Sequence, residues 1–401
     1  MVTEVKILIV SQYYYPEQFQ INEIAPELVR RGHDVTVVCG LPNYPKGKIF
    51  EGYENRFEEE IDGVKVIRCK NVPRGSNPIQ LIRNYYSFVK GSKIVIRTLP
   101  SDYDVVLGYQ LSPITSMLAA LEYKKLHGTP VVFYTLDIWP VSAEGMLHGK
   151  KNPIYWWVKK LSKKIYKGAD RILVTSRPFI DYLHGVLGIL PEKMAYLPQH
   201  AGTEMLDMDL QADDNGIADF MFAGNLGKGQ RVDVIINAAK VLGARNDYKI
   251  HVVGDGRMRQ ELEQMVKENG LEENVVFYGN QKREDMPSFY KKADALLITL
   301  RGNNEVGNTM PGKLQMYMTT GKPIIGAING AAAEVIEDAH CGSCVKAGDY
   351  EGLAILMQFY IEHPKDYKVC GDNARDYFRK HFTLEHYMDR LEAELKKLVE
   401  V

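Results

Sequence analysis

The chain has 401 residues, of which 45% are hydrophobic and 25% charged, and its formal net charge at pH 7 is −1. This length allows two or three domains, and the composition is that of a soluble globular protein. No apolar run approaches the roughly 18 residues that a membrane-spanning helix needs. No signal peptide is recognisable before the first predicted strand, so we expect a cytoplasmic protein.

The first half of the sequence alternates short apolar runs with helical stretches. A helix is predicted near residues 21–31, and strands are predicted at residues 6–10, 34–39, 104–107, 131–134 and 171–175. Apolar strands separated by helices are typical of a parallel sheet that is covered on both faces.

The second half repeats this pattern. Helices are predicted at residues 232–242 and 314–320, and strands at residues 219–223, 248–253, 275–278, 295–300, 323–327 and 343–345. The end of the chain predicts two helices that are interrupted near Phe382 and Thr383. The fold class is therefore α/β, with two doubly wound, Rossmann-like domains facing a cleft and a C-terminal helix that crosses back to the first domain.

An acidic, polar and glycine-containing stretch separates the two halves and sets the predicted domain boundaries. We expect a first domain at residues 1–199, a linker at 200–218, a second domain at 219–375 and a C-terminal helical segment at 376–401 that packs across both domains.

Residues 220–237 are the most informative stretch, because a short apolar strand runs through a glycine-rich loop into a helix. Gly224, Gly227 and Gly229 leave backbone N–H groups free to face a phosphate at the start of that helix, and Lys228 adds a positive charge. The glycine spacing is neither that of a Walker A loop nor that of a dinucleotide fingerprint. The alternative is a strand-to-helix turn that binds no ligand.

Charge is distributed unevenly along the chain. Residues 64–101 and 145–169 contain many lysines and arginines and no acid, whereas acids are concentrated in the second half, for example at residues 204–219. Such clustering indicates that the first half faces an anionic partner.

Two short motifs suggest metal or redox chemistry, but neither has the expected context. Cys341 and Cys344 form a C-x-x-C pair without a second pair or suitably spaced histidines, so we interpret them as buried structural thiols. Asp207 and Asp209 form an Asp-x-Asp string inside the predicted linker, which we interpret as chance. We expect no metal and no other cofactor.

Eight motifs occur in an order that resembles a GT-B glycosyltransferase, and specifically the retaining family 4 enzymes. They lie at residues 11–17, 41–45, 109–113, 136–140, 222–228, 253–256, 309–313 and 317–323, so the resemblance covers essentially the whole chain. Within this family, the sequence resembles bacterial transferases that add N-acetyl-fucosamine-type sugars in O-antigen and capsule synthesis.

The resemblance implies that the second domain binds a UDP-sugar donor. Lys228 is the first candidate to balance the charge of the leaving diphosphate. The basic pair that is usual in the family is missing, because Asn225 and Gln230 occupy its places, so Arg231 or Lys313 is a candidate to share the work. The remaining predicted donor contacts are Gly224, Gly227, Gly254, Asp255, Gly279, Asn280, Gln281, Thr309, Met310, Pro311, Gly312 and Lys313.

One departure from the family concerns its two glutamates. Their places fall near Asn308 and at Met316, so the usual ribose contact is missing. Glu305 is the acid nearest to the first place and is a candidate to touch the donor sugar. Asp255 has an alternative interpretation as a helix cap, and residues 309–313 have one as a simple Pro-Gly turn.

In the first domain, the resemblance implies an acceptor site. Asp137 follows a predicted strand and could orient or deprotonate an acceptor hydroxyl, or else only cap the next turn. Glu17, Asn43 and Gln110 are further candidate acceptor contacts. The implied acceptor is a saccharide on a polyprenyl diphosphate, and retention in this family is described as front-face displacement.

A basic helix near Trp156 and Trp157 indicates that the predicted anionic partner is a membrane surface. Ile154, Trp157, Val158, Leu161 and Ile165 make an apolar stripe with lysines opposite, as in helices that lie on anionic membranes. We therefore expect a protein peripheral to the inner face of the cell membrane and no nucleic-acid partner. The alternative is a helix that packs on its own domain with its lysines in solvent.

Two other functions remain open at the level of sequence. One is a UDP-sugar epimerase of the same fold, which would need no acceptor. The other is a non-catalytic subunit that docks on a partner transferase at the membrane.

Overall fold

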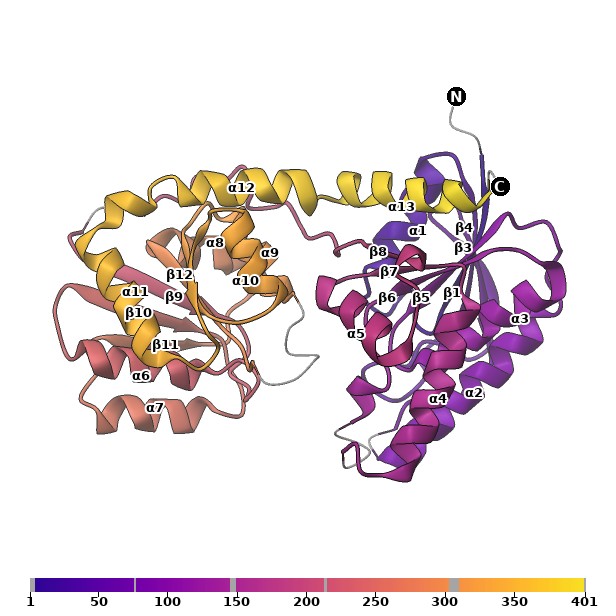
Figure 1. Cartoon of the computed structure of the whole chain (residues 1–401), viewed down its shortest axis with the longest axis horizontal. Helices are drawn as coiled ribbons and strands as arrows, with labels where there is room; N and C mark the ends of the chain where they lie inside the picture. The colour runs from indigo at the N-terminus through magenta and orange to yellow at the C-terminus, as the bar shows by residue number, and fades with distance from the viewer. Residues whose placement is uncertain (1–3, 76, 145–148, 213–214, 303–309, 400–401) are drawn as a thin grey trace. The chain divides into compact units, whose positions relative to one another are not determined.

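The computed structural model describes residues 4–399 except residues 76, 145–148, 213–214 and 303–309. The chain divides into two compact units (Figure 1). Unit 1 comprises Met1–Pro198 and Met388–Val401, and unit 2 comprises Gln199–Tyr387. The last segment of the chain therefore belongs to the same unit as its beginning.

Unit 1 is built on an eight-stranded sheet with the order β3-β4-β2-β1-β5-β6-β7-β8. Neighbouring strands are parallel except for β3, which pairs antiparallel with β4 at one edge. The strands are β1 (Lys6–Ser11), β2 (Asp34–Gly40), β3 (Glu58–Ile61), β4 (Val64–Cys69), β5 (Val105–Gln110), β6 (Val131–Thr135), β7 (Arg171–Val174) and β8 (Met194–Tyr196). The five predicted strands are present with shifted ends, whereas β3, β4 and β8 were not predicted.

Helices cover both faces of this sheet, and α2, α3 and α4 lie side by side (Figure 1). The helices of unit 1 are α1 (Ile21–Arg30), α2 (Pro78–Ile96), α3 (Leu118–His127), α4 (Pro153–Gly168) and α5 (Arg177–Leu187), with 3₁₀ turns η1 (Ile114–Met117), η2 (Val141–Ala143) and η3 (Pro191–Lys193). Both α2 and α4 start with proline after an asparagine cap, because Asn77 and Asn152 accept hydrogen bonds from backbone N–H groups of the first turn.

Unit 2 contains a six-stranded parallel sheet with the order β11-β10-β9-β12-β13-β14. Its strands are β9 (Ala218–Ala223), β10 (Tyr248–Val253), β11 (Val275–Gly279), β12 (Ala295–Thr299), β13 (Ile324–Ala327) and β14 (Gly342–Val345). All six were predicted. The chain runs outward from β9 to β11 and then returns to β12 beside β9, so the strand order reverses between β9 and β12. Ligands of such sheets bind at the carboxyl ends of the strands next to this reversal.

The two faces of this sheet pack against different helices, and β9 shows why. Phe220 and Phe222 are buried with α6, α7 and α11, whereas Met221 and Ala223 are buried with α8, α9, α10 and α12 (Figure 1). Alternate side chains of a strand point to opposite faces, so an almost wholly apolar strand serves both layers. These helices are α6 (Val232–Leu242), α7 (Arg259–Glu268), α8 (Met286–Lys292), α9 (Gly312–Thr319), α10 (Ala331–Asp338), α11 (Tyr350–Glu362) and α12 (Cys370–His381), with η4 (Arg283–Asp285) and η5 (Pro364–Tyr367).

The final helix, α13 (Leu384–Val399), begins in unit 2, and its residues from Met388 onward belong to unit 1. Within unit 1, Arg31 contacts Asp389 at 2.6 Å, and Arg171 contacts Glu394 at 2.6 Å. The predicted interruption near Phe382 is present, because α12 ends at His381.

One sequence-based interpretation is only half right. Cys341 is buried, but Cys344 of the C-x-x-C pair is partly exposed, because it lies on the edge strand β14.

Candidate active site

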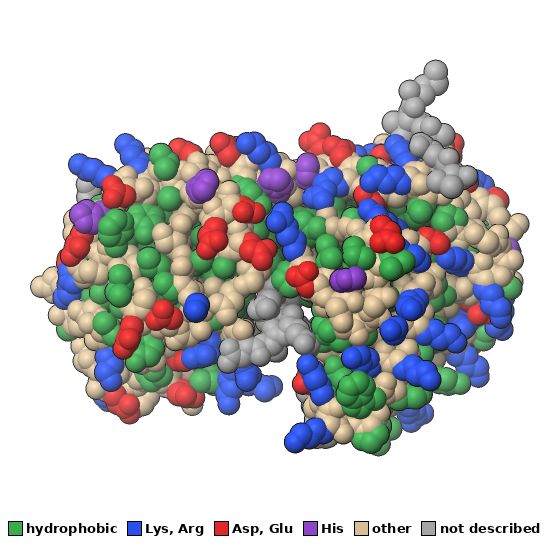
Figure 2. Space-filling view, viewed as in Figure 1, with side chains coloured by type: hydrophobic (Ala, Val, Ile, Leu, Met, Phe, Trp, Pro, Cys, Tyr) green, Lys and Arg blue, Asp and Glu red, His purple; other side chains and the backbone are tan. Residues whose placement is uncertain are grey.

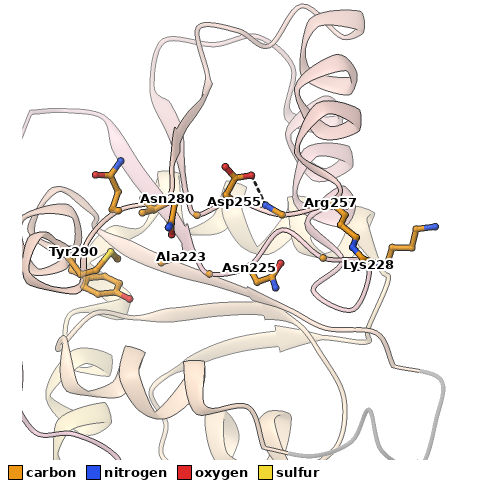
Figure 3. A pocket seen from close by; sticks show the side chains of 14 residues that line it. Ala223, Asn225, Lys228, Asp255, Arg257, Asn280 and Tyr290 are labelled. Atoms are coloured by element: carbon orange, nitrogen blue, oxygen red, sulfur yellow. Dashed lines mark hydrogen bonds between the residues drawn. The ribbon is translucent and has the colours of Figure 1, made fainter. Parts of the chain in front are cut away.

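A cavity of about 1380 Å³ opens at the carboxyl ends of β9 and β10 in unit 2 (Figure 3). It lies beside the strand-order reversal described above. The residues that line it are Ala223, Gly224, Asn225, Gly227, Lys228, Val253, Gly254, Asp255, Gly256, Arg257, Asn280, Gln281, Met286 and Tyr290. Eight of these are predicted donor contacts.

Glycines at the strand ends allow close backbone contacts beside this cavity. Gly224 and Gly254 have φ angles of 145° and 132°, a region that other residues rarely adopt. A Cβ on Gly254 would lie 2.0 Å from the carbonyl oxygen of Gly224, so the two backbones meet where no side chain fits. Backbone N–H groups of Gly224 and Gly254 donate to Val253 and Gly279, which ties three neighbouring strand ends together.

Lys313, in the first turn of α9, lies directly against Gly224. A Cβ on Gly224 would come within 2.8 Å of the Lys313 Cε and Nζ atoms. The ammonium group donates to Gln230 Oε1 at 2.8 Å and lies 3.5 Å from the centre of the Phe222 ring. It forms no ion pair with a described residue, and burial lowers the pKa of Lys313 to about 7.

The three other side chains around the glycine loop, two cations and one amide, differ in their partners. Arg231 is paired with Asp233, with Nη2 and Oδ2 2.9 Å apart. Lys228 is exposed and forms no ion pair within the described part of the chain. Gln230 is the hydrogen-bond partner of Lys313. Arg231 and Lys313 were predicted to share the work of the missing basic pair. Arg231 is paired with Asp233, whereas Lys313 has no carboxylate partner among the described residues.

Arg257 is a cavity residue that the sequence interpretation missed. It is exposed and forms no ion pair with the described residues, unlike its neighbour Asp255, which contacts Arg259 at 3.2 Å and accepts from the Gly256 N–H at 2.7 Å. Figure 3 shows Arg257 and Lys228 at one end of the view and Asn280 and Tyr290 at the other. The sequence could have indicated Arg257, because this residue directly follows the Gly254-Asp255-Gly256 turn that was predicted to contact the donor.

The remaining predicted donor residues fall into three groups. Asn280 and Gln281 line the cavity, and Gly279 ends β11 just before them. Met310, Pro311 and Gly312 precede or begin α9, next to Lys313. Glu305 and Thr309 lie outside the described residues.

Asp137 follows β6 in unit 1 and is surrounded by hydroxyl and indole donors. Its carboxylate accepts hydrogen bonds from Ser142 Oγ, from Trp139 Nε1 at 3.2 Å and from Ser112. Burial nevertheless raises the pKa of Asp137 above its usual range, against the lowering effect of these donors. A carboxylate of this kind is suited to hold or accept a proton.

Gln110, at the end of β5, hydrogen-bonds to the backbone of the loop that carries Asp137. Its side chain is fully buried; Nε2 donates to the Asp137 carbonyl at 2.9 Å, and Oε1 accepts from Tyr166 at 3.2 Å. The structure thus brings Gln110 and Asp137 together, with Gln110 fixing the backbone that carries the carboxylate.

Glu17 and Asn43 are also brought together. Glu17 Oε1 accepts from the backbone N–H groups of Asn43 and Tyr44 at 2.7 and 2.6 Å. The Asn43 side chain donates to the Leu41 carbonyl at 2.9 Å and accepts from the Arg74 N–H at 2.7 Å. Both side chains are almost fully buried, and desolvation raises the pKa of Glu17 to about 7.

Comparison with known families identifies the two halves of the chain. Residues 18–200 match the glycosyl transferase 4-like domain, and residues 211–377 match the glycosyl transferases group 1 family. Each unit is an α/β unit whose sheet is wholly or mainly parallel. Together with this architecture, the matches define the chain as a glycosyltransferase enzyme with the GT-B fold.

Individual proteins agree with this class. The putative colanic acid biosynthesis glycosyl transferase WcaI of Escherichia coli K12 is 25% identical, over 96% of this chain and 99% of its own length. The structure of Anabaena HepE in complex with UDP superimposes with a TM-score of 0.70 at 14% identity, covering 98% of this chain and 100% of that protein. Sucrose-phosphate synthase from Thermosynechococcus elongatus gives a TM-score of 0.73 at 15% identity, covering 98% and 99%.

Proposed function

We propose that this glycosyltransferase moves a sugar, an N-acetylated hexosamine or deoxyhexosamine, from a UDP-sugar to a lipid-linked saccharide, with retention, during the synthesis of a surface polysaccharide such as O-antigen, capsule or exopolysaccharide. The observation that supports the donor half is the unit 2 cavity: Lys228 and Arg257 line it, and Lys313 packs against Gly224 beside it. None of the three cations has a carboxylate partner among the described residues. The leaving diphosphate gains negative charge as the glycosidic bond breaks, and such groups stabilise it without a metal.

The similarity to a colanic acid glycosyl transferase supports a role in polysaccharide synthesis, and the UDP complex of HepE supports UDP as the carrier. In this proposal, the acceptor oxygen bonds to the anomeric carbon on the face from which UDP departs. The hydroxyl proton passes to the leaving phosphate oxygen, and Asp137 orients the hydroxyl.

Binding of nucleotides to the purified protein tests the donor half. We expect UDP and UDP-N-acetylhexosamines to raise the melting temperature more than GDP does, because a ligand of the folded state stabilises it. Lys228→Ala should weaken UDP binding about tenfold, a loss of about 1.4 kcal/mol. Lys240→Ala, which removes an exposed lysine from α6, is the matched control. A protein that binds none of these nucleotides would contradict the proposal and favour a docking subunit.

The products distinguish transfer from epimerisation. Incubation with a UDP-sugar and a polyprenyl-diphosphate-linked saccharide should yield UDP and an extended lipid-linked product. Conversion of the UDP-sugar without any acceptor would instead support the epimerase.

We also propose that unit 1 docks on the anionic inner face of the membrane. The relevant feature is an exposed apolar surface on α2 and α4 among lysines and arginines (Figure 2). Among the described residues, no helix is long and apolar enough to cross a bilayer. The exposed side chains are Ile79 (72%), Ile82 (60%), Tyr86 (71%), Ile154 (55%), Trp156 (57%) and Trp157 (65%).

This surface refines the stripe predicted on α4. Ile165 at its far end is buried in unit 1, whereas Ile154 and Trp157 at its near end are exposed. The helix therefore packs on its own unit at one end and presents apolar side chains with neighbouring lysines at the other. Indole rings beside lysines are suited to the interface of an anionic bilayer.

Sedimentation with vesicles tests this docking. The protein should pellet with phosphatidylglycerol vesicles more than with phosphatidylcholine vesicles, and added salt should weaken the interaction. Trp156→Ser with Trp157→Ser should abolish pelleting. Ile355→Ser with Phe359→Ser, two exposed positions on α11 in unit 2, should not. A wild-type protein that stays in the supernatant with both vesicle types would contradict the proposal.

A further inference from the structure

Unit 1 contains a cationic pocket that the donor and acceptor residues discussed so far do not explain. Its volume is about 400 Å³. It is formed by the loop after β2, the loop after β4 and the first turns of α2. The lining residues are Lys46, Gly47, Val72, Pro73, Arg74, Gly75, Gln80 and Arg83, which include three cations and no acid.

The three cations of this pocket are not neutralised within the described part of the chain. Lys46, Arg74 and Arg83 form no ion pair there, although other basic residues of unit 1 do: Arg97, for example, contacts Glu122 at 2.5 Å. Uncompensated cations that converge on a concave site attract an anion, because their repulsion is relieved when it binds.

Arg74 is held in place before any ligand arrives. Its guanidinium donates to the Tyr13 hydroxyl at 3.3 Å and lies 5.5 Å from the centre of the Tyr44 ring. Its backbone N–H donates to Asn43 Oδ1 at 2.7 Å. The side chain is half-buried, so it has lost part of its conformational freedom already and binds at a lower entropic cost.

The loops that form the pocket are locked together at a glycine. Gly47 has a φ of 70°, and a Cβ at this position would lie 2.4 Å from the Arg74 carbonyl oxygen. Glu17 holds the same loop from the other side through the Asn43 and Tyr44 N–H groups. Glu17 and Asn43 therefore act on this pocket as positioning residues.

Tyr85 on α2 connects the pocket to Asp137. Ser112 is hydrogen-bonded to both the Tyr85 hydroxyl and the Asp137 carboxylate. The hydroxyl of Tyr85 also interacts electrostatically with Arg74 and with Asp137. An anion bound by Arg74 is thus placed near the carboxylate that we propose to orient the acceptor hydroxyl.

We infer that this pocket binds the diphosphate of the lipid-linked acceptor. The inference rests on the proposed function and deepens it by assigning the charged group of the acceptor to Lys46, Arg74 and Arg83. A guanidinium matches two phosphate oxygens at once, and a diphosphate supplies enough negative charge for three cations.

Calorimetric titration with farnesyl diphosphate, a short isoprenyl diphosphate, tests the inference. The full-length protein is first saturated with UDP, so that the cavity in unit 2 is occupied and the UDP heat reports on the proposed function separately. We expect farnesyl diphosphate to bind the UDP-loaded protein. Arg74→Met and Arg83→Met should each weaken this binding at least tenfold and leave UDP affinity unchanged, whereas Lys125→Met, on the exposed part of α3, should change neither.

Several outcomes would overturn the inference while leaving the proposed function intact. In one, UDP binds normally but farnesyl diphosphate does not. In another, the Arg74 and Arg83 variants bind farnesyl diphosphate as tightly as the wild type. A site for a free phosphate would bind inorganic pyrophosphate and ignore farnesyl diphosphate, which also contradicts it. Failure of UDP itself to bind would count against the proposed function instead.

Discussion

The two units use the carboxyl ends of their strands differently. In unit 2, the ends of β9 and β10 carry Gly224 and Gly254, and a cavity of about 1380 Å³ opens there. In unit 1, the loops after β1 and β2 carry Glu17 and Asn43, and β5 ends at Gln110. These three side chains are 2%, 1% and 0% exposed, and they hydrogen-bond to the chain itself.

The comparison shows that one topology produces a site in two ways. In unit 2, glycines at the strand ends let neighbouring backbone segments approach closely, because a Cβ on Gly254 would lie 2.0 Å from the Gly224 carbonyl oxygen, and the cavity opens beside them. In unit 1, buried polar side chains at or after the strand ends order the loops, and the groups that we propose to face a ligand lie on other loops. In unit 1 these groups are Asp137, Arg74 and their neighbours.

The largest expected effect is a loss of kcat without a loss of UDP affinity, when a residue of unit 1 is changed. Asp137→Asn should lower kcat at least about 100-fold, because the neutral amide lacks the charge and the second acceptor oxygen with which the carboxylate orients the acceptor hydroxyl. UDP affinity should stay unchanged, since the cavity that we propose for the donor lies in the other unit. Asp181→Asn, an exposed position on α5, is the control for a lost carboxylate. Steady-state kinetics together with UDP titration check the split, and a parallel loss of UDP affinity would contradict it.

Two glycines test how much loop packing in unit 1 contributes to stability. Gly47→Ala should destabilise the protein by roughly 2–3 kcal/mol, because its Cβ meets the Arg74 carbonyl and its φ is positive. Gly52→Ala is matched, since its φ is 82° but the space around its Cβ is open, and it should cost about 1 kcal/mol. Urea denaturation measures both. Equal losses would mean that the contact with Arg74 is unimportant.

Lys313 offers a pH test of the donor site in unit 2. Its pKa of about 7 lies below the ordinary value of 10.5, so the folded chain loses this proton first and the free energy of unfolding rises as pH goes from about 7 to 10.5. We expect UDP to bind the charged form of Lys313 better, so UDP affinity should fall above pH 7. Lys313→Met should weaken UDP binding roughly tenfold at pH 7 and flatten both profiles. A variant that keeps the falling affinity would show that another group titrates.

These residues also show what could be predicted from the sequence. Apolar strands and glycine turns are local patterns, so the strands of unit 2 and the loop at Gly224 were predicted well. The contact of Lys313 with Gln230 joins residues 83 positions apart and required the fold. The pocket around Arg74 also required the fold. The basic stretch at residues 64–101 predicted an anionic partner, but it did not predict that the loop with Asn43 and Gly47 would pack against Arg74. The edge strand β3, Glu58–Ile61, was missed because acids fill three of its four positions.

The smallest expected effect concerns Glu17, whose pKa of about 7 lies above the ordinary value of 4.5. A carboxyl group with a raised folded-state pKa binds its proton more tightly in the folded chain. The free energy of unfolding should therefore fall as pH rises from about 4.5 to 7. Glu17→Gln keeps an oxygen for the Asn43 and Tyr44 N–H groups and should remove this decline. Urea denaturation at a series of pH values measures it, with Glu54→Gln, an exposed carboxyl in the same unit, as control. An unchanged decline in Glu17→Gln would assign it to another group and leave Glu17 as a charged residue that orders the loop at all pH values.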